Sequence, residues 1–299
     1  MASVPFVFME SVCVVLSHNS LFVLEYANNG PWSTVAEPLM KQTLQYSVID
    51  AFVDEVGAIS VREWFNSEEF PKFRYLDCSH LHIEPVDDSM TMKIVNPSFF
   101  SRMRTYGLNM IDVKFLDKHL NSLCPWYLKD VVITNCTFHS GAVLSSWLKK
   151  AIVNTRISTL NVSENSVVHS VDVKDNFEEE VMDLIIRGRE VVSIEIGSND
   201  SITDLAFPFF KRALDYWIAS KEGYRAWSII LRYQAECEQE MDKFIEDYNF
   251  VKMDYLKVWV LNHDSACTNC EKYVRMAYYS GEFEIAFENE RYFTSESEA

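Results

Sequence analysis

Glycine is scarce in this sequence, with only 8 among 299 residues. Loops that cradle phosphate groups rely on closely spaced glycines, whose backbone N–H groups can point at the anion. The sequence contains no Gly-x-Gly-x-x-Gly motif, no phosphate-binding loop motif and no Gly-x-Ser-x-Gly motif. We therefore expect no cofactor and no catalytic residue, and we interpret the chain as a non-enzymatic protein.

Basic residues are outnumbered by acidic ones. The 27 Lys and Arg residues face 44 Asp and Glu residues, which gives a formal net charge of −17. Such a surface repels the phosphates of nucleic acids and of anionic membranes, so neither is an expected partner. The charge is compatible with basic protein partners, and equally with a surface whose acidity serves only solubility.

Long apolar runs are also missing. No stretch reaches the roughly 18 apolar residues that a membrane-spanning helix needs. The apolar stretch 4–24 is interrupted by Glu10 and His18 and has no positively charged residues before it, as a secretory signal would. We therefore expect an intracellular protein, cytoplasmic or nuclear.

Seven cysteines are present, an odd number that fits reduced thiols better than a disulfide framework. Cys267 and Cys270 form a Cys-x-x-Cys pair, which is half of a common zinc site, and His263 is a possible third ligand. The same spacing also occurs in redox pairs. No second pair completes a four-ligand site, so the interpretation we favour is two thiols in a loop after a strand.

The rest of the composition is that of a folded protein, with 48% hydrophobic and 14% aromatic residues. Short β-like segments recur along the chain, with segments of helical periodicity between them. We predict a hairpin from 46–52 and 59–65 and helices at 140–152, 176–187, 207–220 and 236–248. Further strands are predicted at 73–78, 111–115, 131–134, 158–162, 192–196, 227–231, 256–260 and 283–287.

The spacing of these strands favours repeats. From residue 131 onward they begin about thirty residues apart, which is within the range of β-α solenoids. Residues 158–165 and 192–199 alternate apolar and polar residues and end in Asn, as expected if the polar ones face a concave side. The pattern loosely resembles leucine-rich-repeat-like proteins and predicts an α/β fold with a curved, mainly parallel sheet. An ordinary α/β domain with a parallel sheet would give the same alternation.

The N-terminal residues have a pattern of their own. Apolar residues recur at helical spacing in 5–16 and 32–45, on either side of the turn cluster 28–31. A Val-Pro start, an apolar first helix, a second short helix and the Trp-x-x-x-Ala-x-x-Leu run at 32–39 together resemble an F-box. An F-box-like start before β-α repeats is similar to the divergent F-box-related families of nematodes.

The resemblance implies a partner and a role. F-box proteins bind the Skp-type adaptor of cullin–RING ubiquitin ligases and bring a target protein to it. By this resemblance, Pro5, Phe8, Val12 and Leu16 lie at or near the adaptor interface. The target protein is not identified by the sequence. The alternative is a stand-alone repeat scaffold, whose N-terminal helices only cover the end of the stack.

The expected organisation has three parts. An F-box-like segment spans 1–45, a β-α repeat body spans 46–293, and a short acidic tail, which we expect to be disordered, spans 294–299. The expected function is protein–protein interaction, with the first part holding the adaptor and the second holding the target.

Overall fold

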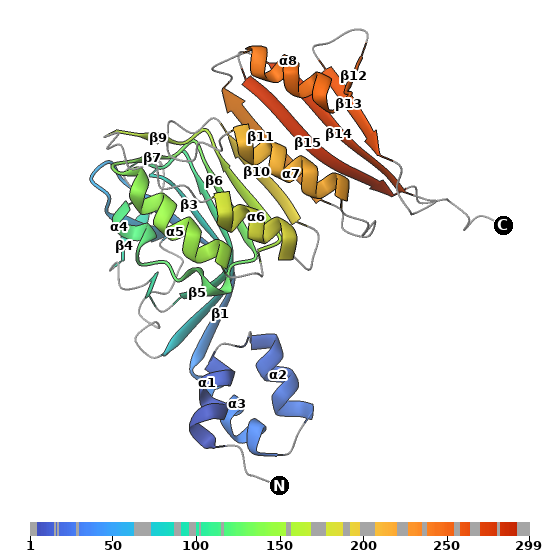
Figure 1. Ribbon diagram of the computed structural model, residues 1–299. Coiled ribbons are helices and arrows are strands. Elements are labelled where there is room, and N and C mark those ends of the chain that lie inside the picture. The colour runs from blue at the N-terminus through green and yellow to red at the C-terminus, as the bar shows by residue number, and fades with distance from the viewer. Residues whose placement is uncertain are drawn as a thin grey trace, which may run out of the picture.

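The computed structural model describes residues 5–14, 16, 18–27, 30–62, 73–86, 91–95, 100–101, 103–114, 117–153, 157–168, 178–187, 192–197, 207–219, 227–234, 238–253, 258–263, 270–279 and 282–291. In these ranges the chain is a mixed α/β protein: a bundle of N-terminal helices stands at one end of a large sheet (Figure 1). The predicted acidic tail at 294–299 lies outside the described residues.

Three helices form the N-terminal unit: α1 (Phe6–Val14), α2 (His18–Ala27) and α3 (Pro31–Lys41). Proline suits the first position of α3, because its φ is already helical and its missing N–H would have no helical partner there. At the other end, the backbone N–H of Gln42 donates to the carbonyl oxygens of Pro38 and Leu39 and closes the helix.

The predictions for this unit were wrong in two respects. The helix predicted over 32–45 ends at Lys41, because the chain enters a strand at Thr43, whereas the helix predicted over 5–16 is confirmed within two residues at each end by α1. Helix α2 was missed by periodicity, although the F-box resemblance implied a short second helix. Its apolar residues form no single stripe, since Leu21 is buried while Phe22 and Val23 are exposed.

The parallel part of the sheet follows chain order. Its strands are β1 (Thr43–Val53), β3 (Tyr75–Pro85), β5 (Met103–Ile111), β6 (Asp130–Thr134), β8 (Thr159–Ser163), β10 (Val192–Gly197) and β11 (Trp227–Gln234). The connections carry α4 (Asp117–Leu120), the 3₁₀ turn η3 (Pro125–Tyr127), α5 (Gly141–Val153), α6 (Glu178–Arg187) and α7 (Phe207–Ala219). Each β-α unit therefore places its strand beside the preceding one.

Both ends of the sheet are antiparallel. At one end, β2 (Ile59–Arg62) pairs with β1 as the predicted hairpin, and β4 (Met92–Ile94) pairs with β2. At the other end, β11 is followed in the sheet by β15 (Glu282–Arg291), β14 (Cys270–Tyr279), β13 (Val258–His263) and β12 (Val251–Lys252). Helix α8 (Glu238–Asp247) lies between β11 and β12 in the chain.

The predicted strands at 256–260 and 283–287 fall within or across β13 and β15, but they are not parallel repeats, and β14 was missed. The connections from β13 to β14 and from β14 to β15 are too short to cross over the sheet, so these strands pair as hairpins. Strand β3 extends well beyond the predicted 73–78. Strand β5 ends where a strand at 111–115 was expected, because Asp112 turns the chain with a φ of 60°.

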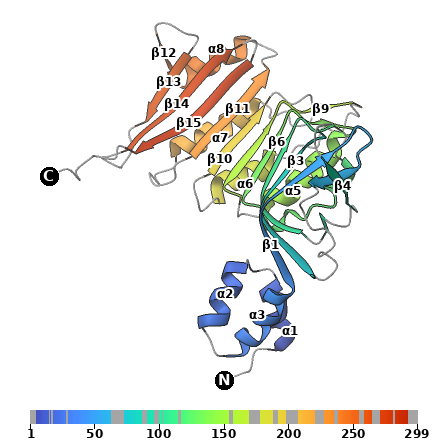
Figure 2. The same cartoon turned by 180° about the vertical axis from the view of Figure 1, so that it is seen from behind.

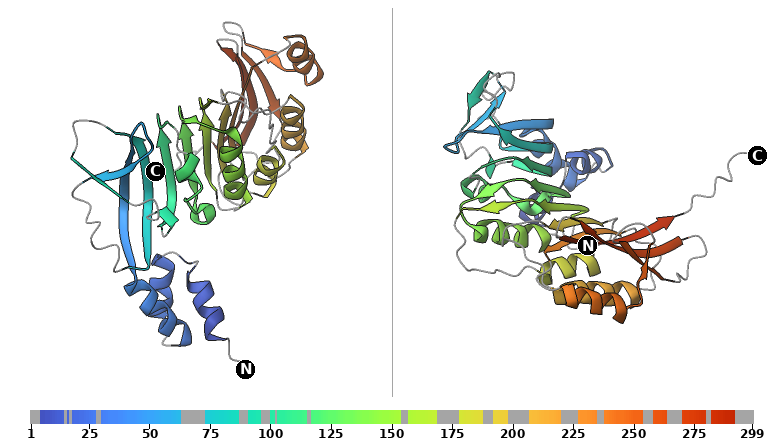
Figure 3. Two further views of the ribbon diagram at one scale, coloured as in Figure 1. Left: turned by 90° about the vertical axis from the view of Figure 1, so that its left-hand side faces the viewer. Right: turned by 90° about the horizontal axis from the view of Figure 1, so that it is seen from above.

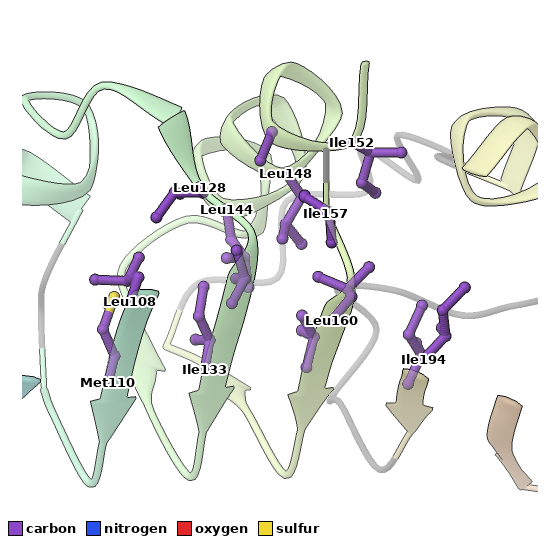
Figure 4. Close-up of a cluster of buried hydrophobic side chains, with 14 of the residues drawn as sticks. Leu108, Met110, Leu128, Ile133, Leu144, Leu148, Ile152, Ile157, Leu160 and Ile194 are labelled. Carbon is purple, nitrogen blue, oxygen red and sulfur yellow. The ribbon is translucent and has the colours of Figure 1, made fainter. Parts of the chain in front are cut away.

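Helices α5, α6, α7 and α8 lie on the same side of the sheet (Figures 1 and 3). Apolar residues at alternate strand positions point toward them and fill the main core, as Ile133 and Leu160 do beneath Leu144 and Leu148 of α5 (Figure 4). The opposite side of the sheet faces the viewer in Figure 2 and carries none of the helices that the described residues form. The four helices predicted from 140 onward are confirmed within about two residues at each end.

Successive strands leave the sheet through the same kind of corner. Asp112, Asn135 and Glu164 each follow a strand and each have a positive φ, at 60°, 53° and 60°. The backbone N–H of each donates to the carbonyl of the next strand along the sheet. After the corners, β7 (Thr137–Phe138) and β9 (Ser166–Val167) form a second, two-stranded parallel sheet.

A buried side chain joins two of these corners. The Asn165 Oδ1 accepts from the backbone N–H of Cys136 at 3.0 Å, and its Nδ2 donates to the carbonyl of Ile133 at 2.9 Å. One unit earlier, the Cys136 thiol occupies the matching position and lies 3.5 Å from the carbonyl of Met110. The repeated geometry therefore includes the polar contacts of its corners as well as its strands.

Candidate functional site

The N-terminal helices have a hydrophobic core of their own. Its buried members come from all three helices and are distinct from the main core: Met9, Cys13, Leu21, Val35, Ala36 and Leu39. From the sheet, Tyr75 of β3 packs against it while remaining half-buried. The helices bury their apolar residues against one another, and they stand beyond the ends of β1 and β3 (Figure 1). This arrangement is that of an appended unit.

The same unit exposes large apolar side chains to solvent. They lie on α1 and α2, and we call them together the N-terminal apolar surface: Phe6 57%, Val7 72%, Phe8 56%, Phe22 47%, Val23 61% and Tyr26 74% exposed. The rings of Phe22 and Tyr26 contact each other, with centroids 4.4 Å apart. Exposed apolar side chains that contact each other, as Phe22 and Tyr26 do, mark a protein contact more often than an isolated exposed one does.

The four residues that the F-box resemblance selects are placed differently from one another. Pro5 lies exposed just before α1, and Phe8 is exposed on it. Val12 is half-buried, and Leu16 packs against the core of the unit. Pro5 and Phe8 are therefore the two of the four that stand open to a partner.

The other members of the N-terminal apolar surface were not selected from the sequence. A signal for them exists, because successive helix residues point about 100° apart. The neighbours Phe6, Val7 and Phe8 cannot all face one core, and the same holds for Phe22 and Val23. Runs of adjacent apolar residues within a short helix therefore indicate an apolar surface on its outer side.

A buried ion pair joins this unit to the sheet. The Arg104 Nε of β5 donates to the Asp77 Oδ1 of β3 at 2.5 Å, and the two side chains are only 4% and 5% exposed. The guanidinium also donates to the Thr43 hydroxyl at 3.2 Å and lies 4.8 Å from the centre of the Tyr75 ring. Thr43 in turn donates to the carbonyl of Leu39 in α3. One network thus holds the last helix of the unit against the first strands.

Strand β3 carries two histidines, His80 and His82, between the buried positions Cys78, Leu81 and Ile83. The His82 Nδ1 lies 3.4 Å from the carboxylate of Asp50, whose other oxygen is 3.6 Å from Arg62. The His80 ring covers Gly107, where an added Cβ would lie 2.5 Å from the ring. Among the residues that the structure describes, no group of three or more His, Cys, Asp or Glu side chains is placed to hold a metal ion.

The Cys-x-x-Cys pair falls partly outside the described residues. Cys267 lies among those not described, while Cys270 begins β14 and His263 ends β13. Two other thiols are well defined. Burial raises the pKa of the Cys78 thiol and that of the Cys136 thiol to about 12. A high pKa leaves little thiolate at neutral pH, so both are structural thiols.

We expect Cys78 and Cys136 to resist alkylation in the native protein. At pH 8, below both raised pKa values, almost no thiolate is present and the side chains are buried, so iodoacetamide should modify them at least about a hundredfold more slowly than after unfolding in guanidinium. Mass spectrometry of tryptic peptides measures the two rates. Rapid alkylation of Cys136 in the native protein would contradict its buried position in the corner that follows β6.

The helices that the structure describes are all too short or too polar to cross a membrane. No protein-family model matches the chain, and no curated protein and no solved structure matches it either.

Proposed function

We propose that this chain is a non-enzymatic interaction protein that joins a Skp-type ligase adaptor to a target protein. In this proposal the N-terminal unit, α1 to α3, is F-box-like and docks the adaptor through the N-terminal apolar surface. The β-α body holds the target. The observation that supports it most is the separate core of the N-terminal unit, combined with the apolar side chains that the unit exposes.

The alternative role, a cap on the end of a stand-alone scaffold, requires a different geometry. A cap buries its apolar residues on the last strand of the stack, so that its core merges with the main core. Here the two cores are distinct, although Tyr75 of β3 packs against the core of the N-terminal unit. Exposed aromatic side chains are also the kind that anchor protein interfaces.

The body supports a leucine-rich-repeat-like assignment as part of the same proposal. The consensus of such repeats places two apolar residues on the strand and then an Asn or Cys three positions on. The β6 segment has this pattern in Val131, Ile133 and Cys136, all buried. The β8 segment repeats it with Leu160 and Val162, followed by Asn165, and all three are buried.

We expect Phe8→Asp to weaken binding of a purified Skp-type adaptor about tenfold or more, because a charge would replace an apolar anchor at the interface. Its melting temperature should change by less than about 3 °C, because Phe8 is 56% exposed in the free protein. Biolayer interferometry and differential scanning fluorimetry on the full-length protein measure the two quantities.

Val56→Asp is the matched control. Val56 is 85% exposed in the turn between β1 and β2, so the variant carries the same kind of charge away from the N-terminal unit and should bind the adaptor as the parent does. Absence of adaptor binding by the parent protein would refute the docking role. A much lower melting temperature of the Phe8→Asp variant would favour the alternative role, in which the N-terminal helices only cap a stand-alone scaffold.

A further inference from the structure

Two histidines stand two positions apart on strand β3. Leu81 and Ile83 of this strand are fully buried in the main core. Because side chains alternate along a strand, His80 and His82 both point to the other side of the sheet from these two. Their rings are neighbours, with centroids 6.5 Å apart. His80 is exposed and His82 is half-buried, so a solute can reach both.

A carboxylate orients the second of these rings. Asp50 of β1 is in register with His82, and its Oδ1 lies 3.4 Å from the His82 Nδ1. The carboxylate favours a proton on Nδ1, so the lone pair of the neutral ring is on Nε2. The Arg62 Nε lies 3.6 Å from the other carboxylate oxygen. Histidines that bind metal ions are commonly held in this way, with the second nitrogen turned to a carboxylate.

A glycine lies beside the first ring. Gly107 of β5 is in register with His80, and a Cβ added to it would lie 2.5 Å from the His80 Cδ2 and 3.2 Å from the Nε2. Only glycine therefore lets the ring approach β5 so closely. The Nδ1 is on the opposite edge of the ring and is turned away from Gly107. The His80 Nδ1 and the His82 Nε2 are thus the two nitrogen atoms that can face a shared ligand.

The spacing of the rings suits one metal ion. Bonds from a metal ion to imidazole nitrogen are about 2.1 Å long, which places the centres of two imidazoles on one ion roughly 5–6.5 Å apart. The 6.5 Å measured here is at the upper end, and a small rotation of the exposed His80 ring shortens it. Imidazole suits Cu²⁺, Ni²⁺ and Zn²⁺, whereas Mg²⁺ and Ca²⁺ prefer oxygen ligands.

We propose that His80 and His82 together bind one divalent transition-metal ion, with Asp50 as a positioning residue for His82. Among the described residues no third side chain joins them as a metal ligand, so water completes the coordination. Affinity follows the usual order for nitrogen ligands, with Cu²⁺ bound more tightly than Ni²⁺ or Zn²⁺. This inference is independent of the proposed adaptor docking, which involves the other end of β3.

Isothermal titration of the full-length protein with NiCl₂ tests the proposal, with MgCl₂ as the ion that should not bind. His80→Gln and His82→Gln should each weaken Ni²⁺ binding about tenfold or more, because each removes one of the two ligands. Asp50→Asn should weaken it about tenfold while leaving both ligands in place. Electron paramagnetic resonance with one equivalent of Cu²⁺ separates these roles. It should show two nitrogen ligands in the parent and in Asp50→Asn, and one in each histidine variant.

His139→Gln is the matched control. His139 is also exposed, but the residues two positions away are Thr137 and Gly141, so it has no paired imidazole and its loss should leave Ni²⁺ affinity unchanged. Absence of Ni²⁺ binding by the parent would overturn the proposal. So would an affinity unchanged by His80→Gln, or equal weakening by His139→Gln. The Cu²⁺ spectrum of the parent needs no variant, and a single nitrogen ligand there would overturn the proposal on its own.

Discussion

Arg104→Met is expected to lower the free energy of unfolding by about 3–5 kcal/mol, because it leaves the Asp77 carboxylate buried without its cation. Both side chains are almost fully buried, and the methionine cannot donate to Asp77 or to Thr43. Urea denaturation followed by tryptophan fluorescence measures the loss. We also expect α3 to lose its fixed position against the sheet, since the same guanidinium holds Thr43 and covers Tyr75.

The double variant Arg104→Met/Asp77→Leu is the matched control. It removes both charges together, and a buried pair replaced by apolar residues of similar size is often close to neutral. It should therefore recover most of the stability that the single variant loses. If Arg104→Met alone costs under about 1 kcal/mol, as surface pairs do, the pair is not buried as described.

Asn165→Ala is expected to cost about 2–5 kcal/mol, because it leaves the backbone N–H of Cys136 and the carbonyl of Ile133 without their partner inside the protein. Asn165→Cys should cost less, because a thiol can approach Ile133 as the Cys136 thiol approaches Met110. Thermal and urea unfolding of the parent protein and the two variants gives the order of their stabilities.

If Asn165→Ala lowered the free energy of unfolding only slightly, or if both variants lowered it equally, Asn165 and Cys136 would not play equivalent roles at their two corners. Asn135→Ala serves as a comparison, because Asn135 is exposed and its change leaves the buried contacts of Asn165 in place. We expect Asn135→Ala to lower the free energy of unfolding by about 1 kcal/mol, because alanine tolerates the positive φ at this position less well than asparagine does.

The sequence was sufficient where a local pattern decides the structure. Helices α5 to α8 and strands β6, β8 and β10 were found because their apolar residues repeat at the helical or strand period and face one core. The hairpin of β1 and β2 was found from its turn. These elements depend on neighbours in the chain, so their signals lie within short windows.

Other features depend on contacts between distant residues and left no such signal. The antiparallel end of the sheet was missed because a strand has the same composition in either direction. The pairing of Arg104 with Asp77 joins β5 to β3 and depends on their register. For the candidate site, Phe8 was selected from the family resemblance, whereas Tyr26 was missed because periodicity did not predict α2, the helix that carries it.

The two outermost strands of the sheet have a consequence for how this protein behaves in concentrated solution. Strand β4 has three residues and β12 has two, so each of these outermost strands itself offers only a few unpaired backbone groups. Long bare boundaries invite strands from other molecules and lead to fibrils, whereas very short ones discourage such growth. A strand from another molecule would therefore find little to pair with at β4 or at β12, which discourages growth of the sheet from these two strands.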